Sequence, residues 1–387
     1  MIKNFMFAFA LLSFAQMQSN SASRSRPSTD AARHRPSSAL ASLKGRLLIW
    51  RDYRSGQKHT SIFYSMKPDG SDQRLLLPTT GDVPSSDEVR FNDTQAISRD
   101  GRSIAFTSNR RHLNAFRAAD ATSEIYLYTV ETGAVKQLTN CGMGTECRSP
   151  RFSPDGKKIV FSLGQSWDAD AGYYRIAVMN RDGSEQHFLT EGNKDDQDRP
   201  ITSSEDARFI GDGSKIYYIK TPVHRVGGHR DYAYVMNANG SKQIRLPEGS
   251  TEDHISHDGR QIAFCKKSGE DTEVFVRNIS AMQSRSVARF HGVASVAEFS
   301  PDGKNVLVVV SEAGSFNAYL VPTNGAAPRL LAKQLSLSRI TFSPDGRKAA
   351  FTSTRDGDRE IFIVNLEGSR QKQITRNTVN DTIVGWL

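Results

Sequence analysis

Several motifs of well-defined chemistry are missing from this sequence. No zinc-finger spacing, basic helix or base-stacking motif accompanies the net charge of +9, so nucleic acid is not an expected partner. The nucleophile elbow G-x-S-x-G is absent, which argues against a peptidase of the propeller-plus-hydrolase kind. No helical H-E-x-x-H pattern occurs either, and no cofactor is expected.

Long apolar runs are also scarce. One run, from Phe5 to Ala15, follows Lys3 and is too short to span a bilayer. Small and polar residues come next, which is the layout of a secretory signal, and no cysteine follows that would attach a lipid. We therefore expect a signal peptide at 1–23, a periplasmic or secreted location, and no transmembrane segment in the mature chain. The alternative is a buried N-terminal helix.

The positive charge is concentrated after this run. Residues 24–44 are rich in Ser, Arg, Ala and Pro, a composition typical of a flexible linker. The rest of the chain is only mildly basic, so the charge does not by itself indicate a polyanionic partner.

Cysteine is rare, with three residues in the whole chain. Cys141 and Cys147 share the glycine-containing segment "TNCGMGTECRSP" and are a candidate disulfide in an oxidising compartment. A metal site is the weaker interpretation, because no second pair of ligands lies nearby in the sequence. Cys265 follows "QIAF" and is expected to be an inert core thiol.

What the sequence does contain is a repeat. In each copy Asp-Gly separates two apolar segments, and glycine tolerates the left-handed backbone of a tight turn while aspartate bonds back to the turn amides. The turn aspartates are therefore expected to be structural. The copies are "ISRDGRSIAF" (97–106), "FSPDGKKIVF" (152–161), "FIGDGSKIYY" (209–218), "ISHDGRQIAF" (255–264), "FSPDGKNVLV" (299–308) and "FSPDGRKAAF" (342–351).

The repeat predicts an all-β propeller. A β-rich segment such as "EIYLYTVETG" (124–133) follows each turn, often with a short fourth strand, and the turns recur every 43–57 residues. We expect four-stranded antiparallel blades over residues 45–387, seven in number, with six as the alternative. "GRLLIW" (45–50) lacks a first strand, and "NDTIVGWL" (380–387) resembles one without its second. The C-terminal strand is thus predicted to complete the first blade and close the ring.

These repeats resemble those of the TolB-like, or WD-like, periplasmic β-propellers. The resemblance rests on 152–190 and 342–375 and covers about residues 45–387. It implies the fold, but related propellers serve as partner-binding modules, as peptidase lids and as sugar-acting enzymes. TolB itself carries an α/β domain before its propeller, and here only a short linker stands between the signal and the first blade.

Candidate binding residues lie in three long connections between second and third strands, at 108–123, 163–173 and 220–231. Strand alternation puts these loops on one face of the ring, where binding groups usually sit. A loop tryptophan can stack on a sugar or anchor a partner, and arginines can pair with carboxylates. The predicted residues are Arg110, Arg111, His112, Trp167, Asp168, His224, His229 and Arg230, with Asp253 and His254 near the channel entrance.

Two functions compete. The first is a monomeric, non-enzymatic module that binds an envelope protein or an acidic glycan. The second is a sugar-acting enzyme resembling the oligogalacturonate lyases, in which Asp253, His254, His224, His229 and His291 assemble a metal or acid–base site in the funnel. Chelation and single His substitutions separate the two.

Overall fold

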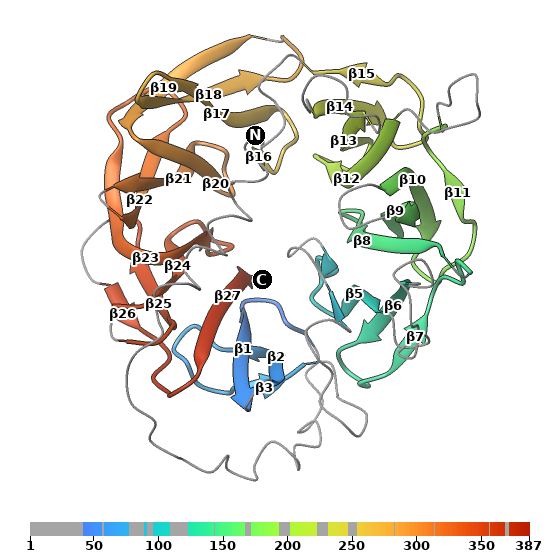
Figure 1. The fold of residues 1–387 in the computed structure, drawn as a ribbon, viewed down its shortest axis with the longest axis horizontal. Coiled ribbons are helices and arrows are strands. Elements are labelled where there is room, and N and C mark those ends of the chain that lie inside the picture. The colour runs from blue at the N-terminus through green and yellow to red at the C-terminus, as the bar shows by residue number, and fades with distance from the viewer. Residues whose placement is uncertain are drawn as a thin grey trace.

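The computed structural model describes most of the chain as a ring of β-sheets (Figure 1). In the described part of the chain, every secondary-structure element of two or more residues is a β-strand. No helix there is long and apolar enough to cross a membrane. The described residues are 42–55, 58–76, 89–90, 96–108, 123–142, 144–166, 172–192, 202–222, 231–246, 254–281, 283–312, 314–355, 357–367 and 371–387.

Five sheets are separate four-stranded antiparallel blades, each with its first strand toward the centre of the ring (Figure 1). From the first strand outward they are β27 (Asn380–Trp386), β1 (Leu47–Ser55), β2 (Lys58–Met66) and β3 (Arg74–Leu75); β4 (Val89–Arg90), β5 (Ser103–Ser108), β6 (Glu124–Thr129) and β7 (Val135–Gln137); β8 (Glu146–Phe152), β9 (Lys158–Ser166), β10 (Gly172–Asn180) and β11 (His187–Phe188); β12 (Thr202–Ile210), β13 (Lys215–Pro222), β14 (Tyr232–Asn237) and β15 (Ile244–Arg245); and β16 (His254–Ile255), β17 (Gln261–Ser268), β18 (Asp271–Asn278) and β19 (Ser284–His291).

The sixth sheet has seven strands, which differs from the expected six or seven separate blades. Its central element is β23, a single strand of 14 residues that pairs with β22 on one side and β24 on the other. The segment contains no Gly or Pro that would separate a last strand from the next first strand, so one strand serves both repeats. The strands are β20 (Val293–Phe299), β21 (Asn305–Glu312), β22 (Ser315–Pro322), β23 (Arg329–Phe342), β24 (Lys348–Ser353), β25 (Glu360–Asn365) and β26 (Gln371–Gln373).

Clusters of buried hydrophobic side chains join the sheets into one ring. Leu48 and Phe63 of one sheet, for example, pack with Phe106 of the next. Another cluster packs Leu307 in one half of the seven-stranded sheet with Phe351 in the other half. That sheet is therefore folded about β23, and its two halves occupy two positions in the ring.

The Asp-Gly turns have the structural role that their sequence predicts. Asp155 Oδ1 accepts hydrogen bonds from Ser153 Oγ (2.6 Å) and the Lys157 N–H (3.1 Å), while Gly156 adopts φ 70°. The hydrogen bond from Ser153 is the main cause that lowers the pKa of Asp155. The same contacts recur at Asp100, Asp258, Asp302 and Asp345.

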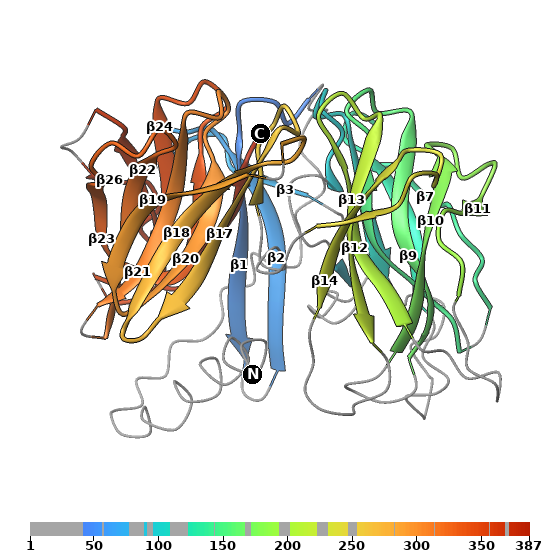
Figure 2. The ribbon, with the colours of Figure 1, turned by 90° about the horizontal axis from the view of Figure 1, so that it is seen from above.

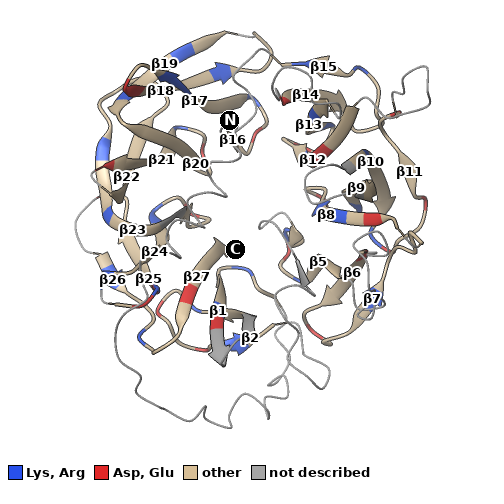
Figure 3. Cartoon of the chain, in the orientation of Figure 1, with Lys and Arg blue, Asp and Glu red and all other residues tan. Residues whose placement is uncertain are grey.

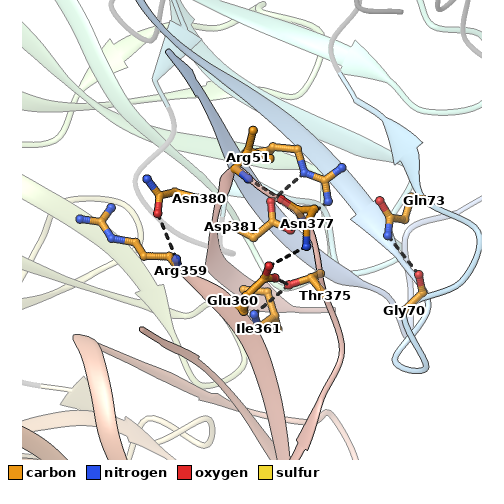
Figure 4. Close-up of polar contacts among 11 residues, drawn as sticks. Arg51, Gly70, Gln73, Arg359, Glu360, Ile361, Thr375, Asn377, Asn380 and Asp381 are labelled. Carbon is orange, nitrogen blue, oxygen red and sulfur yellow. Dashed lines mark hydrogen bonds and ion pairs between the residues drawn. The ribbon is translucent and has the colours of Figure 1, made fainter. Parts of the chain in front are cut away.

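The two ends of the described chain meet in one sheet. β27 pairs antiparallel with β1, from Leu47↔Trp386 to Asp52↔Asn380, as the sequence predicts. A polar junction supports this pairing: Arg51 Nε donates to Asp381 Oδ1 at 2.7 Å and Arg51 Nη2 to Oδ2 at 2.9 Å (Figure 4). The Asp381 side chain is fully buried.

Antiparallel pairing gives the ring two distinct faces, between which the strands run (Figure 2). First-to-second and third-to-fourth connections share the face that we call the turn face, which carries the Asp-Gly turns. Second-to-third and fourth-to-first connections share the opposite face, which we call the loop face. The described strands that flank the three long predicted connections have the corresponding ends at the loop face.

Candidate functional site

Most of the predicted binding residues lie outside the described part of the chain. The structure does show where the three connections begin and end: the first keeps its predicted bounds, while the second and third are shorter than predicted because the flanking strands extend further. They run from Ser108 to Ser123, Ser166 to Gly172 and Pro222 to Asp231. The residues outside the described parts are Arg110, Arg111, His112, Trp167, Asp168, His224, His229, Arg230 and Asp253.

A polar cluster lies close to the end of the second connection, near the loop-face ends of three strands. We call Glu146, Arg148, Tyr174 and Glu205, from β8, β10 and β12, the loop-root cluster. Arg148 Nη2 donates to Glu205 Oε2 at 2.5 Å, and its guanidinium lies 3.5 Å from the centroid of the Tyr174 ring. The Tyr174 hydroxyl donates to Glu146 Oε2 at 2.6 Å. Neighbouring sheets are thereby linked at the loop face.

The loop-root cluster holds two carboxylates and one guanidinium and is only partly exposed. Its arginine stands between two carboxylates, with 35% of the Arg148 side chain and 28% of the Glu205 side chain exposed. Ser203 completes the packing, because its hydroxyl donates to Glu205 Oε1 at 2.9 Å and accepts from the Tyr174 N–H. These contacts hold Tyr174, close to the end of the second connection, against the neighbouring sheet.

In two repeats, the residue directly before the repeated Asp-Gly turn segment makes a hydrogen bond to the first strand of the neighbouring repeat. Arg151 Nη1 donates to the Ala207 carbonyl at 2.9 Å. Glu298 at the equivalent position accepts from the Phe342 N–H at 2.8 Å, across the fold of the seven-stranded sheet. Burial raises the pKa of Glu298 to about 7, although hydrogen bonds from Phe342 and Thr341 oppose the shift. His254, the one predicted binding-loop residue that the structure describes, holds this same position in β16.

The structure contradicts the predicted histidine centre, because His291 lies at the outer edge of its sheet. His291 is the last residue of β19, the outermost strand of its sheet, and its Nδ1 lies 3.0 Å from Asp271 Oδ1. His254 is on the first strand of the same sheet, three strand spacings or about 14 Å away. A funnel site that includes both histidines is therefore wrong. Strand order within the sheet separates them.

The two candidate cysteines are joined. The structure places a disulfide between Cys141 and Cys147, next to the carboxylate of Glu124. Glu124 Oε2 accepts from Thr139 Oγ1 at 2.5 Å and Oε1 from the Cys141 N–H at 2.8 Å. Potential ligand atoms of Glu124, Cys141 and Cys147 lie within 4.8 Å of one another. With the sulfurs bonded to each other, the group is a structural link between a fourth strand and the next first strand.

We expect the disulfide to stabilise the ring modestly. Cys141→Ser combined with Cys147→Ser should lower the free energy of unfolding by about 2 kcal/mol, because the bridge closes only a short loop. Thermal unfolding with and without reductant measures this effect. Reductant should destabilise the wild type and leave the double variant unchanged; an equal response of both would contradict the prediction.

Comparison with known proteins agrees with this architecture. A family model described as "TolB beta propeller domain" matches residues 213–384. The Tol-Pal system protein TolB of Francisella tularensis subsp. mediasiatica is 29% identical over 162 residues, which are 40% of this chain and 37% of that protein. The matched stretches span 7–37% of the length of the curated relatives.

Solved structures show likeness in fold alone. An oligogalacturonate lyase in complex with manganese aligns with a TM-score of 0.54 at 14% identity, covering 86% of each chain. The β-propeller domain of the trilobed protease from Pyrococcus furiosus also aligns with a TM-score of 0.54, at 17% identity, over 86% of this chain and 95% of that one.

Proposed function

Because this chain is a TolB-like β-propeller, we propose that it is an exported, non-enzymatic module that binds a protein or a glycan of the cell envelope. The apolar N-terminal run supports export. The matched relative is named as a component of a Tol-Pal system, which supports a partner-binding role in the envelope. Binding takes place at the loop face.

One observation leads us to choose the loop face as the binding surface. The three long connections start from three consecutive sheets and all leave from the loop face. The loop-root cluster fixes two of the sheets to each other at that face through the contact between Arg148 and Glu205. Long connections on a rigid scaffold are typical of binding surfaces.

The test is capture of partners in intact cell envelopes. We expect cross-linking and mass spectrometry to find specific proteins with the wild type, and Trp167→Ala combined with Arg110→Ala to reduce their capture at least about tenfold, as expected for loss of an aromatic anchor and a charge. The matched control, Phe188→Ala with Lys304→Ala, removes an exposed aromatic and an exposed cation away from the loop face. Equal capture by the two double variants would contradict the assignment of binding to the loop face.

Turnover of an acidic oligosaccharide is the alternative function. The likeness to the lyase supports only the fold, but His254 does lie on a first strand. Oligogalacturonides incubated with the protein, with and without chelator, test this alternative. Chain cleavage that is lost on chelation and in His254→Ala would replace the binding module with an enzyme.

A further inference from the structure

Acidic residues on the strands of this ring are confined to the inner strands, whereas basic residues lie on both inner and outermost strands. Every Asp and Glu that lies on a strand belongs to one of the inner three strands of its sheet, such as Glu205 on β12 or Asp381 on β27. The outermost strands, which are all described, carry no Asp or Glu. Their cations, when β23 is counted only over its outer part (329–335, which pairs with β22), are Arg74, Lys136, Arg245, Arg285, Arg289, Arg329, Lys333 and Lys372.

These cations form a belt around the outside of the ring, which we call the basic rim. Figure 3 shows basic positions on β7, β15, β19 and β26. Except for Arg74, each of these side chains belongs to an exposed residue. These cations are part of the excess of 51 Lys and Arg over 42 Asp and Glu in the whole chain.

Part of the basic rim has a structural role. Lys136 Nζ donates to the Asp182 carbonyl at 2.8 Å, in a turn of the next sheet. Arg285 and Arg329 make equivalent contacts with the carbonyls of Thr323 and Leu366. A single carbonyl occupies one donor of a guanidinium, so these side chains keep both their charge and further N–H groups for a ligand.

The densest part of the rim is on three consecutive outermost strands. β19 and the outer part of β23 are long outer strands, whereas the other outermost strands have two or three residues. Lys333 and Lys372 have no side-chain partner among the described residues. Arg289 lies beside two carboxylates of β18, at 2.8 Å from Asp271 Oδ2 and 3.8 Å from Glu273 Oε1. Cations without compensating carboxylates on the same strands attract polyanions, and salt screens this attraction.

We propose that the basic rim binds acidic polysaccharides, on a surface separate from the loop face. The rim is a convex belt, so a flat bilayer or a stiff duplex touches only a short arc of it, whereas a flexible polymer follows it from sheet to sheet. Hydroxyl and amide groups at Ser284, Ser286, Gln371 and Gln373 accompany the cations and can hydrogen-bond sugar hydroxyls. A peptide joining by strand addition would find suitable edges only at β19 and β23.

Binding to polygalacturonate and to dextran sulfate tests the proposal, with neutral dextran, polyglutamate and phosphatidylglycerol vesicles as comparison probes. We expect both acidic polysaccharides to bind the full chain at about 50 mM salt and to be released at about 300 mM, where the Debye length is much shorter. Neutral dextran should not bind. Tighter binding of polyglutamate or of vesicles than of either acidic polysaccharide overturns the choice of ligand class.

Two triple variants with the same change of charge locate the surface. Arg289→Gln, Lys333→Gln and Lys372→Gln should weaken polysaccharide binding at least about tenfold, since each cation near an anionic surface contributes appreciably. Lys157→Gln, Lys215→Gln and Lys304→Gln on the turn face should weaken it less than about threefold. Equal losses would mean that only net charge matters and would overturn the rim. Trp167→Ala with Arg110→Ala should leave this binding unchanged, which separates the rim from the proposed loop-face function.

Discussion

Replacing Asp381 by asparagine is expected to lower the free energy of unfolding by about 3 kcal/mol. The Asp381 carboxylate is fully buried and accepts two hydrogen bonds from Arg51, whose side chain is only 12% exposed. It also accepts from Asn377 Nδ2 at 2.9 Å (Figure 4). The substitution keeps the shape but removes the carboxylate charge that pairs with the Arg51 guanidinium, and breaking one side of a buried pair typically costs about 3–5 kcal/mol.

Denaturant unfolding of the wild type and of Asp381→Asn measures this loss. Asp271→Asn is the matched control, because Asp271 also pairs with an arginine, Arg289, but at the exposed edge of a sheet. Exposed ion pairs contribute little, so the control should change stability far less. Since β27 is the last strand, the Asp381 variant should also become more sensitive to proteolysis at its C-terminus. Similar losses for Asp381→Asn and Asp271→Asn would show that the junction does not hold the two ends together.

A glutamine at position 298 is expected to change how stability depends on pH. Burial raises the pKa of Glu298 from an ordinary value of 4.5 to about 7, so the folded protein holds this proton more tightly than the unfolded chain does. Protonation therefore favours folding: the contribution is fully present below pH 4.5 and is lost as the pH rises through 7.

Glu298→Gln removes this dependence while keeping an oxygen that can accept from the Phe342 N–H. We expect the variant to be about 1–2 kcal/mol more stable than the wild type at pH 8, and to show no such gain at pH 4. The free energy of unfolding of both proteins, measured between pH 4 and pH 8, tests this prediction. Glu367→Gln, the same chemical change in an exposed turn, is the control. A gain for Glu298→Gln that is equal at pH 4 and pH 8 would rule out titration of Glu298 as its cause.

Local patterns predicted the repeating parts of this protein. The Asp-Gly turns formed where the six sequence copies placed them, because Ser153, Asp155 and Gly156 interact within a few residues. The pairing of the C-terminal strand with β1 followed from two incomplete repeats. The pairing of Cys141 with Cys147 was likewise suggested by their closeness in the chain.

Contacts between distant segments were not predicted. The loop-root cluster joins Arg148 to Glu205, and the junction of the chain ends joins Arg51 to Asp381, 330 residues apart. In both cases an ordinary charged residue in a strand gives no signal of its partner. The hypothesis that placed His291 in the funnel failed for the same reason, since the sequence does not reveal which edge of a sheet a residue occupies.

By itself the sequence determined the four-stranded repeat, its turns and the all-β architecture, since these depend on backbone preferences that act over a few residues. Only the tertiary structure decided that β23 serves two repeats, that Glu298 meets Phe342 across the fold of a sheet, and that strand carboxylates lie inward of a basic rim. These features depend on which strands become neighbours around the ring. The free energy of burying and pairing charges is set by those neighbours, not by spacing along the chain.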